Sequence, residues 1–177
     1  MTTVNRTTKE TTVRAAIARD GESRIATTVP FLDHMLVTLA RYSGLVLVVD
    51  ARGDLRHHII EDVAITLGES LRAFAPVTAA RYGNALVPMD DALVQCALDL
   101  GGRAYYEGPL PSSFYDHFMR SLATQGAMTL HLRVLRGRDR HHVVEAAFKA
   151  LGLSLRSALV ETGAVFSTKG AALVETR

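Results

Sequence analysis

Six of the seven histidines of this 177-residue chain belong to one pattern that occurs twice. The pattern is F-x-D-H followed downstream by H-H-x-x-E. Its histidines and glutamates are His34, His57, His58 and Glu61 in the first copy, and His117, His141, His142 and Glu145 in the second. Imidazole and carboxylate groups without thiolate suit Mn2+, Fe2+ or Zn2+, and they disfavour copper(I) and iron–sulfur centres. These eight side chains therefore predict a site for two divalent metal ions.

The spacing within H-H-x-x-E predicts how the ligands divide between the two ions. Successive residues of an α-helix are about 100° apart, so the adjacent imidazoles of each pair point apart and cannot converge on one ion. Each pair is expected to split between two ions, with the glutamate within reach of either. Four protein ligands per ion leave positions on a six-coordinate ion for substrate or water, and manganese accepts that geometry best.

The two copies match beyond the ligands themselves. Residues 31–40 align with residues 114–123 at an offset of 83, with five of ten positions identical, and residues 57–61 align with residues 141–145 at an offset of 84. A single histidine is more often a hydrogen-bonded core or surface residue than a ligand, but two matched sets favour metal binding. His131, the histidine outside the pattern, is interpreted as structural.

Each half predicts the same order of elements: a β-hairpin, a helix, a strand and a second helix. Hairpin strands are expected at 10–18 and 23–29, around Asp20-Gly21, and at 92–98 and 104–107, around Gly101-Gly102. The single strands are expected at 45–50 and 128–135, and the second helices at 61–74 and 145–160. Asp33 and Asp116 are candidate caps at the start of the first helix of each half.

This order predicts an α+β fold made by internal duplication. Residues 1–85 would form the first half and residues 86–177 the second, within one integrated domain. Each half is expected to have a mixed or antiparallel sheet with helices on one face, and the two helix layers pack between the sheets. If ligands on the two helices of one half lie too far apart to share an ion, neighbouring subunits would supply the missing ligands, which would couple metal binding to assembly.

The composition is that of a folded protein, with 48% hydrophobic and 21% charged residues. The net charge of +2 comes from scattered basic residues, which gives little support for nucleic-acid binding. No apolar run approaches the roughly 20 residues of a membrane span, and the first residues lack the apolar core of a signal peptide. Cys96 is alone, so we expect a buried cysteine in a protein of the reducing cytoplasm.

With these motifs in view, the sequence resembles the imidazoleglycerol-phosphate dehydratase family from about Arg6 to Gly170. Several further segments carry the resemblance. They are Thr8-Lys9-Glu10-Thr11, Arg81-Tyr82-Gly83, Met89-Asp90-Asp91-Ala92-Leu93, Gly102-Arg103, Thr129-Leu130-His131 and Ser167-Thr168-Lys169-Gly170.

The resemblance implies an enzyme that removes water from imidazole glycerol phosphate, giving imidazole acetol phosphate in histidine biosynthesis. It further implies two manganese ions per active site, a fold like domain 2 of ribosomal protein S5, and 24-subunit cages built from trimers with each site between subunits. In such chemistry an ion on the substrate's imidazole nitrogen favours the imidazolate, whose electrons expel the neighbouring hydroxyl. A glutamate must act as general base, and Glu10, Glu61 and Glu145 all remain candidates.

By the same resemblance, Arg81, Arg103 and Lys169 match the family's phosphate-binding positions. Ser167 and Lys169 also suit an anion on chemical grounds, because hydroxyl, ammonium and backbone N–H groups can line such a site. Glu10 is included among the substrate-binding candidates. The segment 53–58 is shorter than in the family and lacks the acidic pair that usually precedes the first two histidines, so the groups that orient His57 and His58 stay open.

Two other functions remain open for the same ligands. A non-catalytic assembly stapled by metal ions would explain the ligands but leaves Arg81, Arg103 and Lys169 without a purpose. A dinuclear hydrolase would direct an activated water at a phosphate ester. Such hydrolases usually carry bridging aspartates, and the only aspartates of the F-x-D-H pattern are Asp33 and Asp116.

Overall fold

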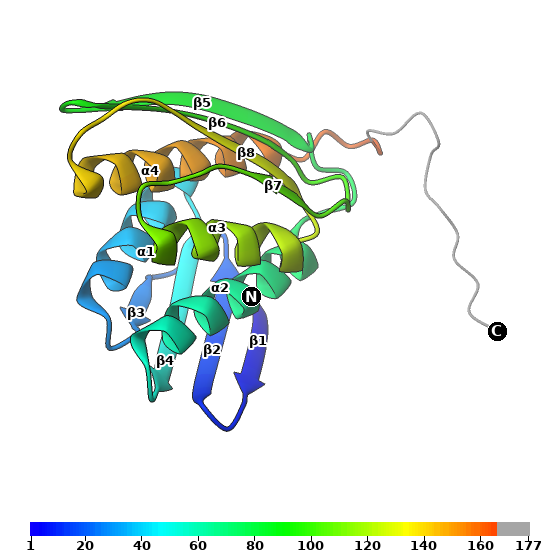
Figure 1. The fold of residues 1–177 in the computed structure, drawn as a ribbon. Helices are drawn as coiled ribbons and strands as arrows, with labels where there is room; N and C mark the ends of the chain where they lie inside the picture. Colours follow the sequence, from blue (N-terminus) through cyan, green and yellow to red (C-terminus); the bar gives the residue numbers. More distant parts are fainter. Residues whose placement is uncertain (166–177) are drawn as a thin grey trace.

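A computed structural model describes residues 1–165 of the chain, which fold as two similar halves (Figure 1). The first half runs β1 (Thr2–Thr7), β2 (Thr11–Ala18), β3 (Arg24–Ala26), α1 (Pro30–Ser43), β4 (Val46–Gly53) and α2 (Arg56–Phe74). The second runs β5 (Tyr82–Met89), β6 (Ala92–Asp99), β7 (Tyr105–Glu107), α3 (Ser113–Gln125), β8 (Thr129–Arg136) and α4 (Arg140–Ala158).

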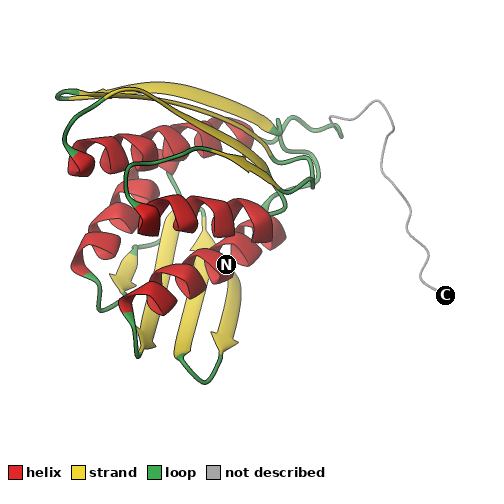
Figure 2. Ribbon diagram, in the orientation of Figure 1, coloured by secondary structure: helices red, strands yellow, loops and turns green. Residues whose placement is uncertain are grey.

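The four helices form two layers between the two sheets, and the predicted α+β fold with an internal duplication is confirmed (Figure 2). Helix α2 packs on β1 and β2, while α4 packs on β5 and β6. Between the layers, α1 packs on α4 and α2 packs on α3, so every helix contact between layers joins one half to the other. Buried apolar residues of both halves belong to one core.

The predicted hairpins are wrong in their pairing. The sheets have the strand orders β1-β2-β4-β3 and β5-β6-β8-β7, and the short strands β3 and β7 run parallel to β4 and β8. The real hairpins are β1–β2 and β5–β6, and their first strands were not expected from the sequence. The eight-residue strands β4 and β8 contain more buried residues than the three-residue β3 and β7, and they occupy the inner positions beside β2 and β6.

The helices that follow β4 and β8 begin earlier than predicted. Helix α2 begins at Arg56 and α4 at Arg140, so each H-H-x-x-E pattern lies in the first turns of its helix. The predicted caps are also wrong, because α1 begins at Pro30 and α3 at Ser113, which places Asp33 and Asp116 inside the first turn.

Cys96 is buried in β6, as expected, and burial raises the pKa of its thiol to about 12.

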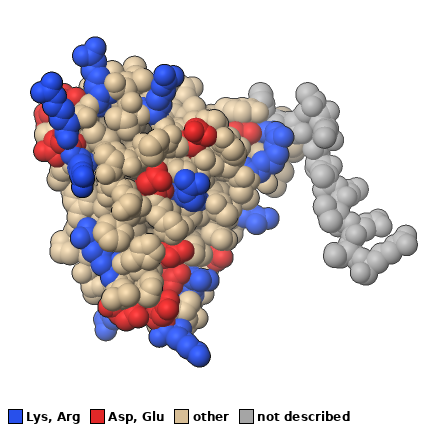
Figure 3. All heavy atoms as spheres, in the orientation of Figure 1, with Lys and Arg blue, Asp and Glu red and all other residues tan. Residues whose placement is uncertain are grey.

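No helix within residues 1–165 is long and apolar enough to cross a membrane. On the face shown in Figure 3, Lys and Arg side chains are interspersed with acidic and uncharged residues rather than joined in a continuous basic surface.

Two glycines at equivalent positions allow the helix layers to approach closely. A Cβ on Gly68 of α2 would lie 2.8 Å from the carbonyl oxygen of Leu122 in α3. A Cβ on Gly152 of α4 would lie 2.8 Å from the Cβ of Tyr42 in α1. A Cβ atom cannot approach another heavy atom this closely unless one of the two helices shifts. The packing of the two helix pairs therefore depends on the absence of a side chain at these positions.

We expect Gly68→Ala and Gly152→Ala each to lower the free energy of unfolding by about 1–3 kcal/mol, because overpacking outweighs the gain of about 1 kcal/mol in helix propensity. Urea unfolding followed by circular dichroism measures the change. Ser157→Ala, at an exposed position of α4, is the control and should change stability little. Stabilisation by either glycine substitution would contradict the close approach.

Candidate metal centre

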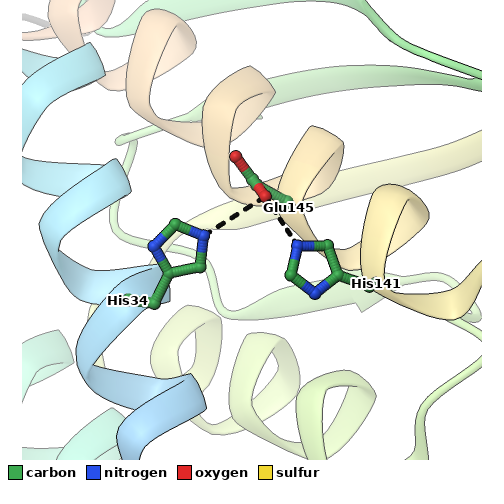
Figure 4. A group of neighbouring side chains, drawn as sticks. All are labelled: His34, His141 and Glu145. Carbon is green, nitrogen blue, oxygen red and sulfur yellow. Dashed lines mark hydrogen bonds and ion pairs between the residues drawn. The ribbon is translucent and has the colours of Figure 1, made fainter.

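The first group of metal-ligating side chains contains His34, His141 and Glu145 (Figure 4). His34 projects from α1, and the other two project from α4. The Nε2 atoms of His34 and His141 lie 3.3 and 3.0 Å from the same carboxylate oxygen, Oε2 of Glu145. Two imidazole nitrogens and a carboxylate oxygen that lie within 4.8 Å of one another form a donor set that fits a divalent ion.

The second group repeats this arrangement with the roles of the halves exchanged. His117 of α3 lies 3.1 Å from Oε1 of Glu61, and His57 lies 3.6 Å from Oε2 of the same residue on α2. Each group therefore joins the F-x-D-H histidine of one half to the H-H-x-x-E residues of the other. The contacts of α1 with α4 and of α2 with α3 are the cause of this exchange.

The aspartate of each F-x-D-H pattern fixes the helix turn that carries the histidine. Asp33 Oδ1 accepts hydrogen bonds from the backbone N–H of Thr27, at 2.8 Å, and from its hydroxyl, at 2.6 Å. Asp116 Oδ1 accepts from the backbone N–H of Leu110, at 2.9 Å, and from the hydroxyl of Tyr106, at 2.7 Å. Both aspartates thus tie the start of their helix to the segment six residues earlier, which holds the neighbouring histidine in place.

The phenylalanine of each pattern packs on a histidine from the opposite half. The Phe31 ring centroid lies 5.2 Å from that of His141, and the Phe114 centroid lies 5.9 Å from that of His57. These contacts restrict the rotamers of the two histidines. The phenylalanine, aspartate and histidine that the two copies of the pattern share therefore each help to form one of the two groups.

His58 and His142 belong to neither group, and each has its Nδ1 against a carboxylate instead, Asp54 for His58 and Asp91 for His142. The ring planes of His57 and His58 are 76° apart, and those of His141 and His142 are 88° apart. One histidine of each pair thus belongs to a group and the other does not, while the division of each pair between two ions and the metal-binding role of all eight residues stay predictions.

Carboxylates that the sequence analysis missed orient these two outlying histidines. His58 Nδ1 lies 2.8 Å from Asp54 Oδ1, and His142 Nδ1 lies 2.7 Å from Asp91 Oδ1. A carboxylate can only accept, so each Nδ1 carries the proton and each Nε2 is the candidate ligand atom. His142 Nε2 also faces Asp90 Oδ2 at 3.4 Å. Asp54 stands four residues before His58, a helical spacing that was available as a signal.

The carboxylate Glu10 lies in the turn between β1 and β2, where its Oε2 is 3.6 Å from His58 Nδ1. The backbone of this turn is braced by Thr8, whose hydroxyl accepts from the N–H groups of Glu10 and Thr11 at 3.1 and 3.0 Å. Asp62 holds the same turn to α2, because it accepts hydrogen bonds from the Thr11 hydroxyl and from Arg6 Nε. Glu10 is thus an exposed carboxylate on a fixed backbone beside a candidate ligand.

Of the expected phosphate-binding residues, Arg81 lies far from the His34–His141–Glu145 group within one chain. The backbone N–H of Arg81 donates a hydrogen bond to the carbonyl of Ala158, at the end of α4, and its guanidinium binds Asp99 at 2.5 and 2.9 Å. Helix α4 rises about 26 Å from His141 to Ala158, at about 1.5 Å per residue. Arg103 is exposed in the segment before β7, while Ser167 and Lys169 lie outside the described residues.

Known proteins are similar to this chain in sequence and fold. The profile of the imidazoleglycerol-phosphate dehydratase family matches residues 27–155. The chain belongs to this family. Curated imidazoleglycerol-phosphate dehydratases from Pyrobaculum aerophilum and Thermus thermophilus are 46% and 45% identical to it, over 93% and 95% of this chain and 96% and 97% of their own lengths.

Solved structures of imidazoleglycerol-phosphate dehydratase agree with the fold. The crystal structure from Pyrococcus furiosus, in complex with (S)-C348, has a TM-score of 0.88 and 42% identity, covering 96% of this chain and all of the other. The structure from Staphylococcus aureus has a TM-score of 0.81 and 32% identity, covering 90% and 98%. Imidazoleglycerol-phosphate dehydratases are hydro-lyases that dehydrate imidazole glycerol phosphate in histidine biosynthesis, so this chain is an enzyme of that class.

The His142–Asp91 pair should stabilise the fold in one pH window. The hydrogen bond to Asp91 raises the pKa of His142, so its contribution is full below the ordinary value of 6.5 and is lost as pH rises through the raised pKa. Hydrogen bonds from His142 and from the backbone N–H groups of Arg138 and Asp139 lower the pKa of Asp91 to about 2. The contribution of Asp91 to the free energy of unfolding is therefore full above its ordinary pKa of 3.8, and it is lost as the pH falls through the lowered pKa of about 2.

We therefore expect Asp91→Asn to reduce the free energy of unfolding more at pH 5 than at pH 9. Urea unfolding of the chelator-treated protein at both values tests this. Asp20→Asn, an exposed loop carboxylate, is the control and should show the same small effect at both. A larger loss at pH 9 would show that the pair does not act through its charges.

Proposed function

We propose that this enzyme dehydrates imidazole glycerol phosphate to imidazole acetol phosphate with two Mn2+ ions per active site. The observation that carries the metal dependence is the pair of matched groups, each with two imidazole nitrogens and one carboxylate oxygen. When bound, such ions supply Lewis acidity and a template for the polar groups of the substrate. One carboxylate per group also favours this function over a dinuclear hydrolase, which would need a carboxylate bridging two ions.

The chain's own residues would handle the proton. A general base must be close to the substrate carbon yet free to accept a proton. Glu61 and Glu145 each face two histidines in their groups, which weakens them as bases once an ion is bound. Glu10 lies outside both groups on a braced turn, so we assign the proton transfer to Glu10 and the ligand role to the other two.

We further propose that each active site forms between subunits. The candidate ligands His58 and His142 belong to neither group of their own chain, and Arg81 lies about one α4 length from His141. The substrate, an imidazole ring on a three-carbon phosphate chain, is far shorter than that. An arrangement in which one copy supplies the metal groups and another supplies Arg81, Arg103, Ser167 and Lys169 removes the difficulty. A 24-subunit cage built from trimers, in the reducing cytoplasm, is the assembly and location we propose.

The activity test is incubation of the Mn2+-loaded enzyme with imidazole glycerol phosphate, followed by detection of the enolised ketone in alkali. His141→Ala and His117→Ala should each reduce kcat/KM by at least about a hundredfold, because each removes a ligand from one group. His131→Ala, outside both groups, is the control and should retain activity. Absence of product from the wild type would reject the dehydratase function, and product without any bound metal would reject the metal dependence.

The assembly test is the mass of the particle in solution, with and without chelator. We expect chelation to convert a large particle into smaller units, because Nε2 of His58 and His142 would join an ion held by another copy. The double variant His58→Ala, His142→Ala should stay small even with Mn2+. A particle of unchanged mass in chelator would mean that the ions serve catalysis alone, whereas a metal-bound particle without dehydratase activity would favour the stapled assembly.

A further inference from the structure

The two metal groups are built alike but their carboxylates have different neighbours. Glu61 and Glu145 are equivalent in the repeat, and the residue four positions later is Ile65 in the first half and Lys149 in the second. Positions i and i+4 of a helix lie on the same face, so this residue stands beside the carboxylate. The residue beside the carboxylate therefore carries a positive charge in only one of the two copies.

Lys149 is firmly held against Glu145. Its Nζ lies 3.0 Å from Glu145 Oε1, 3.3 Å from the sulfur of Met89 and 5.7 Å from the ring centroid of Tyr42. The side chains of Lys149 and Glu145 are only 17% and 10% exposed.

The Glu61 carboxylate has no such partner within the described residues. Its two oxygens face only histidines, Oε1 toward His117 at 3.1 Å and Oε2 toward His57 at 3.6 Å, and its side chain is 36% exposed. An ion that binds at Glu61 therefore meets a carboxylate whose negative charge is not offset by a lysine or arginine among the described residues. An incoming ion at Glu145 meets one that already binds an ammonium, and the repulsion between the two cations is little screened at a buried site.

We propose that the two metal groups are unequal: the His57–Glu61–His117 group binds Mn2+ first and more tightly, and Lys149 makes the His34–His141–Glu145 group the weaker one. The inequality rests on the proposed function, since both groups are taken to be metal sites. Burial alone would act in the opposite direction, because a desolvated carboxylate attracts a cation more strongly. The identity of the tighter group therefore tells which effect dominates.

Binding of Mn2+ to the chelator-stripped full-length protein, followed by the electron paramagnetic resonance signal of free Mn2+, measures the two affinities. We expect two classes of site whose Kd values differ about tenfold, the scale set by one charge-assisted hydrogen bond. Glu145→Gln should leave only the tight class, and Glu61→Gln should leave only the weak class. A single class of site would overturn the proposal. So would a result in which Glu145→Gln leaves the weak class and Glu61→Gln leaves the tight class.

Reciprocal variants test the role of Lys149 directly. Lys149→Met removes the charge at similar volume and should tighten the weak class about tenfold, while Ile65→Lys places a lysine at the matched position and should weaken the tight class similarly. Arg156→Met, which removes a charge from the exposed last turn of α4, is the control and should change neither class. Circular dichroism establishes that each variant is folded, and if Ile65→Lys is not, Lys149→Met decides alone.

An unchanged weak class in folded Lys149→Met would overturn the proposal while leaving the dehydratase function intact. Absence of Mn2+ binding at both groups would overturn it together with the metal dependence. The product assay described above separates these two outcomes, because it reports dehydration without reference to which group binds first.

Discussion

The contact between the two helix layers is the constraint on which the candidate site depends. Helices α1 and α3 each supply one histidine, and neither half contains a partner for it on its own second helix. The ligands meet because α1 lies on α4 and α2 lies on α3, with Gly68 and Gly152 allowing the close approach. The apolar burial that stabilises the core is thus also what assembles each group, and a loss of packing between the layers would separate the ligands.

The position of the groups at helix starts imposes a second constraint. The first turns of α2 and α4 carry the free N–H groups and the positive end of the helix dipole, which disfavours a cation. Glu61 and Glu145 lie just beyond these turns and provide the negative charge that offsets the dipole. Asp33 and Asp116 place further negative charge in the first turns of α1 and α3. A pair of histidines without the glutamate would therefore be a poor site here, which accounts for the composition of the repeated pattern.

The sequence predicts what depends on local spacing and fails where distant segments compete. Helical spacing predicted that His57 and His58 do not converge, because the angle between adjacent residues follows from the helix alone, and only His57 belongs to one of the groups. Strand pairing is different, since β4 takes the position beside β2 only by burying its apolar residues against elements on both sides. The same limitation explains why Asp91 was missed: it reaches His142 across 51 residues, through a turn whose place in space is set by the sheet.

Duplication has kept the groups alike while letting their surroundings diverge, and the hairpin turns show the consequence. The β1–β2 turn and the β5–β6 turn occupy equivalent places, each beside the second histidine of a pair. In the second half, Asp91 is fully engaged, since it orients His142 and accepts from the N–H groups of Arg138 and Asp139.

In the first half, Asp54, just before α2, orients His58. The β1–β2 turn therefore does not have to supply the carboxylate that orients this histidine. Glu10 therefore stands at 3.6 Å with no hydrogen bond to its carboxylate among the described residues, on a backbone that Thr8 and Asp62 keep in place. A proton acceptor requires a carboxylate that is held in place by its backbone and whose oxygens accept no hydrogen bond from the protein. In this half one acidic residue, Asp54, orients the histidine, and another, Glu10, is left as the proton acceptor that we propose.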